Sequence, residues 1–387
     1  MFSVQILNKI SPAGLELLPR AKYEIASEIM HPDAVLVRSH NMLQVELPPS
    51  LKAIARAGTG VNNIPVDRCT DRGIVVFNTP GANANSVKEL VLAGLFLTSR
   101  NIYQGINWAK ALRGRGQEVP KLVEKGKSQF AGPEIKGKKL AVVGLGAIGV
   151  AVANDAAALG MDVTGYDPFI SVESAWDLSR HIKRAKGFES LLGECDYLTL
   201  HVPQTEQTKG MINTEKFQLV KKGARILNFA RGGLVNNYDL LEAIQKGIVS
   251  WYITDFPDDQ LLASDRVIPI PHLGASTPEA GENCARMAVQ QVQEFLEKGN
   301  IRNSVNFPEC EMDFTGKRRL VIANRNIPAM VGQITAVLAN DGINIADMLN
   351  RSKEKAAYNI IDIDSDISEE SISKIRNIKG VTKVRVI

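Results

Sequence analysis

The sequence predicts an α/β protein with two doubly wound parallel-sheet domains and a smaller C-terminal domain. Three observations lead to this class. Short apolar runs alternate with helix-like segments over most of the chain. A glycine-rich turn at residues 144–149 follows a buried-strand pattern in the middle of the chain. The last ~70 residues have the order strand, helix, strand, strand, helix, strand, which is typical of a βαββαβ domain.

Residues 4–80 predict a small α/β domain whose strands end in polar residues. Ligands of parallel sheets collect at the carboxyl ends of the strands. Arg38 and Ser39 follow one predicted strand, and Arg56, Thr59 and Gly60 follow another. These residues are therefore candidates for binding an anionic ligand. We expect strands at Val4–Leu7, Ala34–Val37, Leu51–Ala57 and Ile74–Phe77, and a helix from about Ser86 to Lys110.

The glycine turn has the pattern of a dinucleotide-binding loop. Gly144 permits the tight turn, Gly146 lets the backbone approach a pyrophosphate, and Gly149 allows close packing of helix on strand. A strand at Leu140–Val143 and a helix at Ala147–Leu159 frame the loop, so that Ala147 and Ile148 open the helix at the phosphate. A further strand at Met161–Tyr166 leads to Asp167, whose carboxylate would accept hydrogen bonds from both ribose hydroxyls. The motif therefore predicts NAD, in preference to NADP.

Two later strand ends carry residues suited to the oxidation of a hydroxy acid. Arg231 offers a planar, permanently charged fork to a carboxylate. His272 stands before a Gly/Ser/Thr loop, and histidine is the usual acceptor of a hydroxyl proton near pH 7. We expect strands at Tyr197–Val202, Arg225–Phe229, Trp251–Asp255 and Val267–Ile270, which with the fingerprint pair make six.

The other four histidines are weaker candidates for the proton acceptor. His31 and His181 lie in segments without a motif, and His40 lies in a polar loop near Arg38. His201 ends a strand that should border the cofactor, where contact with NAD is a better expectation than acid-base chemistry.

Composition excludes several other classes of protein. The chain has 46 basic and 42 acidic residues among 387, and no basic run suggests nucleic acid. Its four cysteines have neither CxxC nor metal-ligand spacing, which predicts reduced thiols and no metal site. The most apolar stretch, Leu90 to Leu97, is too short to span a bilayer. We expect a cytoplasmic enzyme that acts on a small molecule.

The motifs together resemble those of the D-isomer specific 2-hydroxyacid dehydrogenases. The resemblance covers about residues 34–280 and rests on Arg56–Val61, the glycine fingerprint, Asn228–Gly233 and Pro271–Thr277. It implies a flavodoxin-like substrate domain (1–97 and 276–307) split around a Rossmann NAD domain (98–275). It further implies that Arg231 binds the substrate carboxylate and carbonyl, that His272 is the general acid/base, and that an acidic residue holds the imidazole. The NAD contacts that it implies beyond the fingerprint are His201, Val202, Pro203, Thr208, Phe229, Ala230, Asp255 and Gly274.

The sequence departs from the family at the acidic partner of His272. The family usually has Asp-Val-Phe-x-x-Glu-Pro, whereas residues 253–260 read Ile-Thr-Asp-Phe-Pro-Asp-Asp-Gln. An alignment on Phe256 makes Asp259 the partner, and an alignment on Asp255 puts Gln260 there. We favour Asp259 as partner and Asp255 beside the nicotinamide. Lys88 is an unusual cation in a loop that should face the substrate, where it could bind phosphate or assist proton transfer.

Residues 318–387 resemble an ACT regulatory domain with the ferredoxin-like order. In dehydrogenases of this family such domains pair side by side and bind L-serine at the seam. Asn326 and Asn344 match positions that contact the amino acid, whereas Asn324 replaces the usual histidine and Pro328-Ala329 the usual Pro-Gly. Serine binding and a purely structural role in dimerisation both remain open. The resemblance implies a homodimer or homotetramer.

The prediction is NAD-dependent oxidation of a phosphorylated D-2-hydroxy acid. Arg38, Ser39, Arg56, Thr59, Gly60 and Arg231 are the expected substrate contacts. One alternative is a glyoxylate, lactate or other 2-hydroxyacid reductase, against which the cations and the ACT-like segment argue. The other is an NAD-sensing interaction protein on the same fold, against which the presence of both Arg231 and His272 argues.

Overall fold

The computed structural model describes all residues, 1–387, and the chain forms two compact units. Residues Asn83–Ala280 form one, the inserted unit. Residues Met1–Ala82 and Gly281–Ile387 form the other, the split unit. The expected boundary at residues 97/98 falls inside helix α3 (Ala84–Ser99), which belongs to the inserted unit with its whole length.

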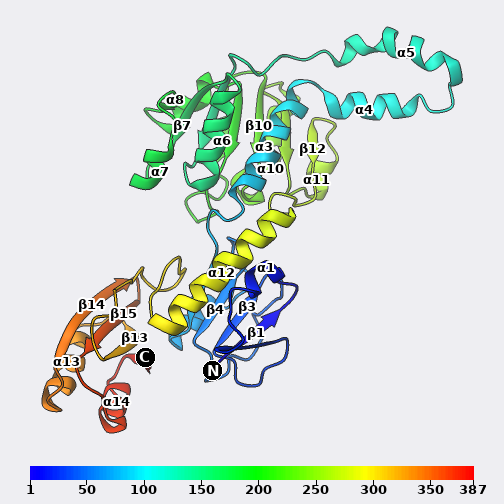
Figure 1. Cartoon of the computed structure of the whole chain (residues 1–387). Coiled ribbons are helices and arrows are strands. Elements are labelled where there is room, and N and C mark those ends of the chain that lie inside the picture. The colour runs from blue at the N-terminus through cyan, green and yellow to red at the C-terminus, as the bar shows by residue number, and fades with distance from the viewer. The chain divides into compact units, whose positions relative to one another are not determined.

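The first part of the split unit is a five-stranded parallel sheet in the order β2-β1-β3-β4-β5 (Figure 1). This is the flavodoxin-like order. The edge strand β2 has no counterpart among the strands expected from the sequence, because Tyr23–Ala26 is short and only partly apolar. The bounds are β1 Phe2–Leu7, β2 Tyr23–Ala26, β3 Ala34–Val37, β4 Ala53–Arg56 and β5 Val75–Phe77, with helices α1 Pro12–Leu15 and α2 Val66–Asp71.

The inserted unit holds a seven-stranded parallel sheet in the order β12-β11-β10-β9-β6-β7-β8. The chain order reverses between β6 and β9, and ligands of such sheets bind outside the carboxyl ends of the strands at that switch point. Six of the strands match the expected ones, and the two-residue edge strand β8 is additional. The strands are β6 Lys139–Val143, β7 Asp162–Tyr166, β8 Lys183–Arg184, β9 Tyr197–Leu200, β10 Ala224–Asn228, β11 Val249–Thr254 and β12 Val267–Pro269. The helices besides α3 are α6 Ala147–Ala158, α7 Val172–Asp177, α8 Phe188–Glu194, α9 Thr214–Phe217, η3 Gly232–Leu234, α10 Asn237–Gln245 and α11 Asp259–Leu262.

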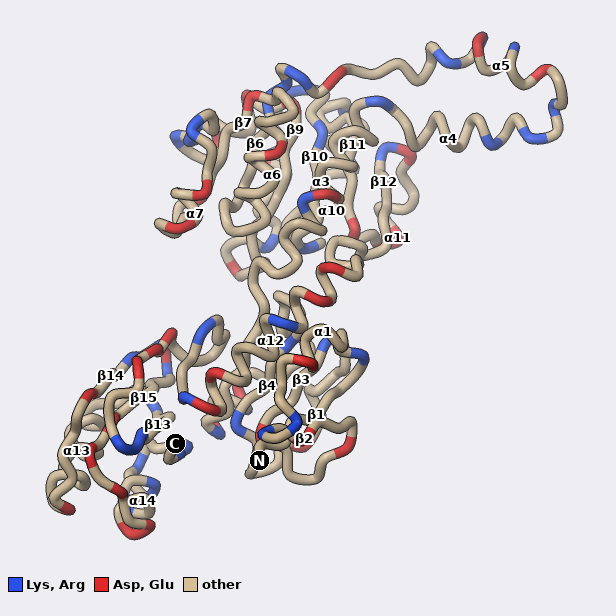
Figure 2. Tube along the Cα trace, in the orientation of Figure 1, with Lys and Arg blue, Asp and Glu red and all other residues tan.

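A helical arm projects from the inserted unit (Figure 1). The continuous helix expected as far as Lys110 is interrupted at Asn101, whose φ of 49° lies in the left-handed region. Helix α4 (Ile102–Ala111) follows and has no buried residue, while Ile102, Tyr103 and Ile106 are 39–46% exposed. The arm continues through η1 (Gly116–Glu118), α5 (Val119–Gly126) and η2 (Lys127–Phe130), and Figure 2 shows both charge signs along it.

The second part of the split unit is the expected βαββαβ domain. Its four-stranded antiparallel sheet has the order β14-β15-β13-β16. Helices α13 and α14 cover one face of this sheet, and leucine and isoleucine side chains fill the space between them. The elements are β13 Arg318–Arg325, α13 Met330–Asn340, β14 Ile345–Lys353, β15 Ala356–Ile363, α14 Glu369–Arg376 and β16 Val381–Val386.

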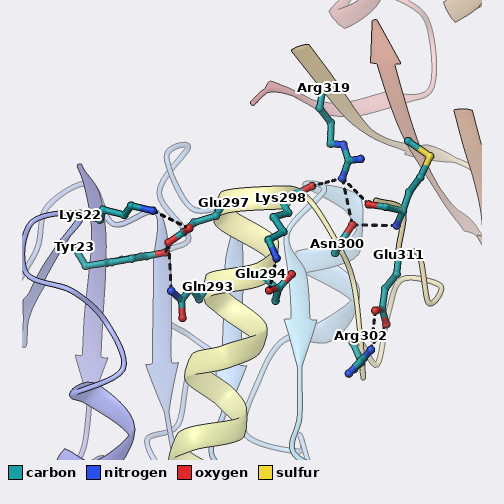
Figure 3. Close-up of polar contacts among 11 residues, drawn as sticks. Lys22, Tyr23, Gln293, Glu294, Glu297, Lys298, Asn300, Arg302, Glu311 and Arg319 are labelled. Atoms are coloured by element: carbon teal, nitrogen blue, oxygen red, sulfur yellow. Dashed lines mark hydrogen bonds and ion pairs between the residues drawn. The ribbon is translucent and has the colours of Figure 1, made fainter. Parts of the chain in front are cut away.

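Helix α12 (Pro278–Lys298) ties the two sheets of the split unit together. Its apolar face packs in one core with strands of both sheets. The last carbonyl groups of a helix lack partners within the helix. Arg385 donates to the carbonyl oxygens of Phe295 and Leu296, and Arg319 donates to that of Lys298 (Figure 3). Two arginines of the C-terminal domain thus complete the end of α12. No helix in the structure is both long and apolar enough to cross a membrane.

Candidate active site

The glycine loop lies at the carboxyl end of β6, at the switch point of the inserted sheet. Gly144 has φ of 90°, and a Cβ there would lie 2.6 Å from the carbonyl oxygen of His201. A Cβ on Gly149 would lie 1.9 Å from the carbonyl oxygen of Gly144, so the helix can pack here only without a side chain. Gly146 has open space around its Cβ position and is the N-cap of α6. The loop therefore offers free room and a helix N-terminus to a pyrophosphate.

Asp167 follows β7 and faces the same loop. Its Oδ2 accepts a hydrogen bond from the Leu145 amide at 2.8 Å, and its Oδ1 accepts one from the Phe169 amide at 2.8 Å. A carboxylate has about four acceptor positions, so each oxygen retains one for a ribose hydroxyl. Ala147 and Ile148 form the first turn of α6, directly after the loop whose Leu145 amide Asp167 binds. These residues fit NAD.

His201 is fixed on the other side of the switch point. Its amide donates to the Val143 carbonyl at 2.7 Å, and its Nε2 lies 3.0 Å from Thr199 Oγ1. Burial lowers the pKa of the His201 imidazole to about 4, so the ring is neutral near pH 7. This supports a role next to the cofactor and not as the proton acceptor.

The loop after β9 is closed by Thr208. Its hydroxyl donates to the Pro203 carbonyl at 2.6 Å and accepts from the Thr205 amide at 2.7 Å. The loop from Val202 to Thr208 thus keeps a defined course past the switch point, although its side chains are largely exposed.

Arg231 lies beyond the carboxyl end of β10. Asn228 is fully buried and donates from Nδ2 to the Arg231 carbonyl at 2.9 Å and to Tyr252 Oη at 3.1 Å, which fixes the turn. Phe229 is buried, whereas the Arg231 guanidinium is exposed and donates to the Ala230 carbonyl at 2.6 Å. A cation in this position can exchange that single contact for a carboxylate held by two hydrogen bonds.

His272 follows β12 and is held by its backbone and by a ring contact. Its amide donates to the Asp255 carbonyl at 3.1 Å, and its ring lies 4.7 Å from the Phe256 ring, centre to centre. The loop is open to solvent at this point, because Pro271, His272 and Leu273 are exposed. The imidazole is therefore accessible to a substrate.

Asp255 is a carboxylate that interacts electrostatically with His272. It is 2% exposed, and its Oδ2 accepts from the Gly274 amide at 3.1 Å. Burial raises the pKa of Asp255, while the Gly274 hydrogen bond and the positive charges of His272 and Arg231 act in the opposite direction. Its Oδ1 is buried without a hydrogen-bond partner, an arrangement that costs free energy unless a ligand supplies a donor. The nicotinamide amide has such donors.

Asp259 lies elsewhere. It is exposed at the start of α11, and no hydrogen bond or ion pair joins it to His272. Its neighbour Asp258 caps α11 by accepting from the Leu261 amide at 2.9 Å, and it also accepts from Asn237 Nδ2 at 2.6 Å. Gln260 is half-buried in the same helix. The roles of Asp259 and Asp255 remain predictions, and the structure brings only Asp255 to His272.

Lys88 on α3 forms an ion pair with Asp155 on α6, with Nζ 2.8 Å from Oδ2. Its side chain is 16% exposed. The sequence singled out the lysine and gave no signal for its partner, because the two residues are 67 positions apart. The pair joins α3 to α6, and a substrate role would require the ammonium group to leave Asp155.

The candidate substrate contacts of the split unit gather at the carboxyl edge of its parallel sheet. Arg56 Nε donates to the Arg38 carbonyl at 3.0 Å. The Ser39 amide donates to Asn8 Oδ1 at 3.2 Å, and the Thr59 carbonyl accepts from Asn78 Nδ2 at 2.7 Å. Gly60 continues this loop and is half-buried.

Asn8 and Phe256 are positioning residues that the sequence analysis did not identify. Asn8 follows β1 with φ of 71°, and its side chain holds the loop after β3. An asparagine directly after a strand is a signal for such a turn. Phe256 belongs to the segment 253–260 that differs from the family motif. Its contact with His272 arises because β11 and β12 are neighbours in the sheet.

The three asparagines of the C-terminal domain have local partners. Asn324 is buried and accepts from Asn359 Nδ2 at 2.7 Å, Asn326 donates to the Glu354 carbonyl at 3.0 Å, and Asn344 donates to Asp364 Oδ2 at 2.6 Å. Asn324 pairs with Ala357 at one end of β15, whereas Asn344 precedes the pairing of Ile345 with Ile363 at the other end. Six residues of extended strand span roughly 20 Å. One copy of the domain therefore does not bring Asn344 to the other two.

Comparisons with known proteins agree with this geometry. Residues 92–274 match the family model of the D-isomer specific 2-hydroxyacid dehydrogenase, NAD binding domain. The D-3-phosphoglycerate dehydrogenase of Methanocaldococcus jannaschii is 34% identical over 85% of this chain and 61% of its own length, so this chain spans about three fifths of that relative. The enzyme of the same name from Haemophilus influenzae is 32% identical over 89% of this chain and 83% of its own length.

Solved structures share the fold. The NAD+-bound 3-phosphoglycerate dehydrogenase of Entamoeba histolytica is 26% identical, with a TM-score of 0.61 over 79% of this chain and 98% of that one. The D-mandelate dehydrogenase of Rhodotorula graminis has a TM-score of 0.67 at 21% identity over 80% of this chain and 99% of that one, a likeness of fold alone.

Proposed function

Because the chain belongs to the D-isomer specific 2-hydroxyacid dehydrogenase family, we propose that it oxidises D-3-phosphoglycerate at C2 to 3-phosphohydroxypyruvate, with NAD as acceptor. This is the first step of the phosphorylated route to L-serine. The observation that carries the proposal is the 32% identity with the Haemophilus influenzae D-3-phosphoglycerate dehydrogenase over 89% of this chain. That coverage is too large to lie within either unit alone, and it spans 83% of the relative's own length.

In this proposal each candidate site residue has one role in binding or in proton transfer. Arg231 grips the substrate carboxylate and polarises the C2 oxygen, and His272 accepts the hydroxyl proton. NAD, when bound, supplies the hydride acceptor. Gly144, Gly146 and Gly149 admit its pyrophosphate, and Asp167 accepts from its ribose. Arg38 and Arg56, with Ser39, Thr59 and Gly60 around them, hold the substrate phosphate.

Steady-state kinetics with NAD and a panel of D-2-hydroxy acids test the substrate. We expect kcat/KM for 3-phosphoglycerate to exceed that for D-lactate, D-glycerate and the reverse reaction of glyoxylate by at least 100-fold. Charge-assisted contacts to the phosphate, each worth about 1.5 to 3 kcal/mol, supply that ratio. Preference for an unphosphorylated acid would favour the second candidate, another 2-hydroxyacid dehydrogenase. Tight NAD binding without turnover of any acid would favour an NAD-sensing interaction protein.

Arg56→Gln separates binding of the phosphate from the chemistry. We expect it to raise KM for 3-phosphoglycerate about tenfold or more and to leave the slow turnover of D-glycerate unchanged. Arg231→Gln serves as the matched variant, because it removes the carboxylate contact that both substrates share and lowers kcat/KM for both. Equal effects of Arg56→Gln on the two acids would remove Arg56 from the phosphate site.

The partner of His272 is tested by Asp259→Asn beside Asp255→Asn. If Asp259 holds the imidazole, its variant shifts the acidic limb of the pH profile of kcat/KM and lowers kcat. If the profile and turnover are unchanged, that assignment fails. Asp255→Asn is expected to raise KM for NAD. The substitution replaces one of the two carboxylate oxygens by an NH2 group, so only one acceptor remains for the Gly274 amide and the nicotinamide amide together. A pH shift in Asp255→Asn alone would make Asp255 the partner.

Lys88 has two proposed roles, a phosphate contact and an aid to proton transfer. Asp155→Asn releases the ammonium from its ion pair without changing Lys88 itself. A lower KM for 3-phosphoglycerate in this variant is expected if Lys88 serves the substrate. No change would limit the lysine to joining α3 and α6.

Regulation by L-serine and assembly into a homodimer or homotetramer belong to the same proposal. Asn324 and Asn326 lie at one end of the C-terminal sheet and Asn344 at the other, so a second copy must supply the third asparagine for one serine molecule. Titration of L-serine against the initial rate tests the effector, and a flat response up to millimolar concentrations would remove it.

The exposed apolar residues of α4, Ile102, Tyr103 and Ile106, support assembly through the arm. Light scattering of Ile106→Asp tests this.

Cytoplasmic residence is also proposed. All four cysteines are buried and free, which fits a reducing compartment. Location of a tagged copy of the chain by cell fractionation tests it.

A further inference from the structure

A cationic cavity lies in the split unit, apart from the candidate substrate contacts Arg38 and Arg56. It has a volume of about 690 Å³, and its lining includes Asp71, Arg72, Arg325, Gly380, Thr382 and Lys383. Pro48 and Ile74 place it at the amino ends of β4 and β5. Arg56 is at the carboxyl end of β4, so the substrate edge and this cavity lie at opposite ends of one strand. Strand β16 of the C-terminal domain forms the facing wall.

The lining carries more positive than negative charge. Arg72, Arg325 and Lys383 are three cations against the single carboxylate of Asp71, and none of the three forms an ion pair. Arg72 donates to the Leu47 carbonyl, and Lys383 donates to the Leu51 carbonyl. Carbonyl groups solvate these cations without neutralising them.

Lys383 shows that the surplus charge has a cost. Burial, together with the smaller effects of the positive charges of Lys52, Arg385 and Arg72, lowers the pKa of Lys383 to about 8. Lys52 is itself paired with Asp33, and Arg385 is occupied at the end of α12. A desolvated ammonium among cations is unfavourable unless an anion completes the arrangement.

The walls of the cavity are tightly built. Gly73 has φ of 65°, and a Cβ there would lie 2.7 Å from Lys383 Cβ and 2.9 Å from Thr382 Oγ1. The turn between α2 and β5 thus packs directly on β16. The β13–β16 pairing shifts register opposite Thr382, whose hydroxyl donates to the Ala323 carbonyl at 3.0 Å. Register irregularities of this kind often aim side chains at a site.

We propose that this cavity binds a small phosphate-bearing anion, with Lys383, Arg72 and Arg325 as its counter-charges. The guanidinium fork matches the spacing of phosphate oxygens, and a lysine ammonium adds a point charge. A dianion would balance the net surplus of two positive charges in the lining. The volume exceeds that of inorganic phosphate and admits a phosphate ester of metabolite size. The ligand would join the N-terminal sheet to the C-terminal domain at a seam that the proposed reaction does not use.

Isothermal titration of the full chain with inorganic phosphate, at constant ionic strength set with chloride, tests the proposal. We expect saturable binding that weakens about tenfold in Arg325→Gln and in Lys383→Gln. Lys374→Gln is the matched control, since this exposed lysine of the same domain is paired with Asp341 and does not line the cavity. It should bind phosphate as the unaltered chain does.

Arg56→Gln distinguishes this site from the proposed substrate site. The cavity predicts that phosphate binding persists in Arg56→Gln and weakens about tenfold when Arg325→Gln is combined with it. Binding that disappears in Arg56→Gln alone, or that ignores both cavity variants, would overturn the proposal and leave the proposed function intact. Arg325 is exposed, so its variant remains decisive even if Lys383→Gln does not fold.

Discussion

Replacement of Arg319 by methionine should cost about 4 kcal/mol of stability in the split unit. Arg319 and Asp362 are both fully buried, with Nε–Oδ1 and Nη2–Oδ2 distances of 2.6 and 2.8 Å. Removal of one partner from a buried ion pair typically costs about 3 to 5 kcal/mol, because the remaining charge is left without compensation. The carbonyl groups that lose a donor are those of Lys298, Met312 and Asp313. The loss of these three hydrogen bonds is already included in the 3 to 5 kcal/mol, because contributions within one network of contacts do not add independently.

Arg302→Met is the matched control. Arg302 donates to both oxygens of Glu311 at 2.8 Å, but the two side chains are 68% and 42% exposed. An exposed pair of this kind contributes about 0 to 1 kcal/mol. The two substitutions thus remove the same bidentate contact in buried and in exposed surroundings, on neighbouring segments (Figure 3).

Hydrogen exchange followed by mass spectrometry measures the difference where it arises. Amides of β13 and β15 should exchange about 1000-fold faster in Arg319→Met and little faster in Arg302→Met. All three tryptophans, Trp108, Trp176 and Trp251, lie in the inserted unit. Their fluorescence therefore follows urea unfolding of that unit, and its midpoint should not move.

Equal acceleration of exchange in the two variants would refute the reasoning. A second check is the double variant Arg319→Met/Asp362→Leu, which removes both charges and should recover most of the loss. If the double variant is no more stable than the single one, packing and not charge accounts for the effect.

Three further predictions concern single groups. Asp167→Ala should weaken NAD binding roughly tenfold to 100-fold and narrow the preference for NAD over NADP, as measured by titration of both coenzymes. Gly149→Val should abolish NAD binding in the same titration, because even a Cβ would lie 1.9 Å from the Gly144 carbonyl oxygen; normal affinity would contradict the loop geometry. Lys383 has a folded-state pKa of about 8, below its unfolded value of 10.5, so the unfolded chain binds this proton more tightly. Stability should consequently rise between pH 8 and 10.5, by at most about 3 kcal/mol, and Lys383→Met should lack that rise in urea unfolding.

The fold was predictable from the sequence to the extent that periodic apolar patterns define it. Both parallel sheets and the βαββαβ domain are confirmed, because central strands contain continuous apolar runs such as Ala34–Val37 and Leu140–Val143. The edge strands β2 and β8 were missed, since short half-polar segments take their conformation from a neighbouring strand. The break at Asn101 was also missed, because nothing in the local pattern separates α3 from α4.

The candidate site was less predictable, since its contacts join distant segments. The fingerprint and Asp167 come together as expected because they belong to one βαβ unit. The choice between Asp255 and Asp259 could not be made from spacing alone, since it depends on which carboxylate lies beneath the loop after β12. The ion pair of Lys88 with Asp155 joins two helices in space, and no motif connects them.

The division of one unit around the other sets the order in which a nascent chain can fold. Residues 83–280 complete their own core, whereas the sheet formed by residues 1–82 shares its core with α12 and later segments. Asn306, for example, donates to Thr70 Oγ1 and to the Ile74 carbonyl, and these contacts form only after the last part of the chain is made. The first segment to leave the ribosome must therefore wait, with apolar surface uncovered, while some two hundred residues are synthesised behind it. Chaperone demand during synthesis should accordingly concentrate on the N-terminal segment, which is first made and last buried.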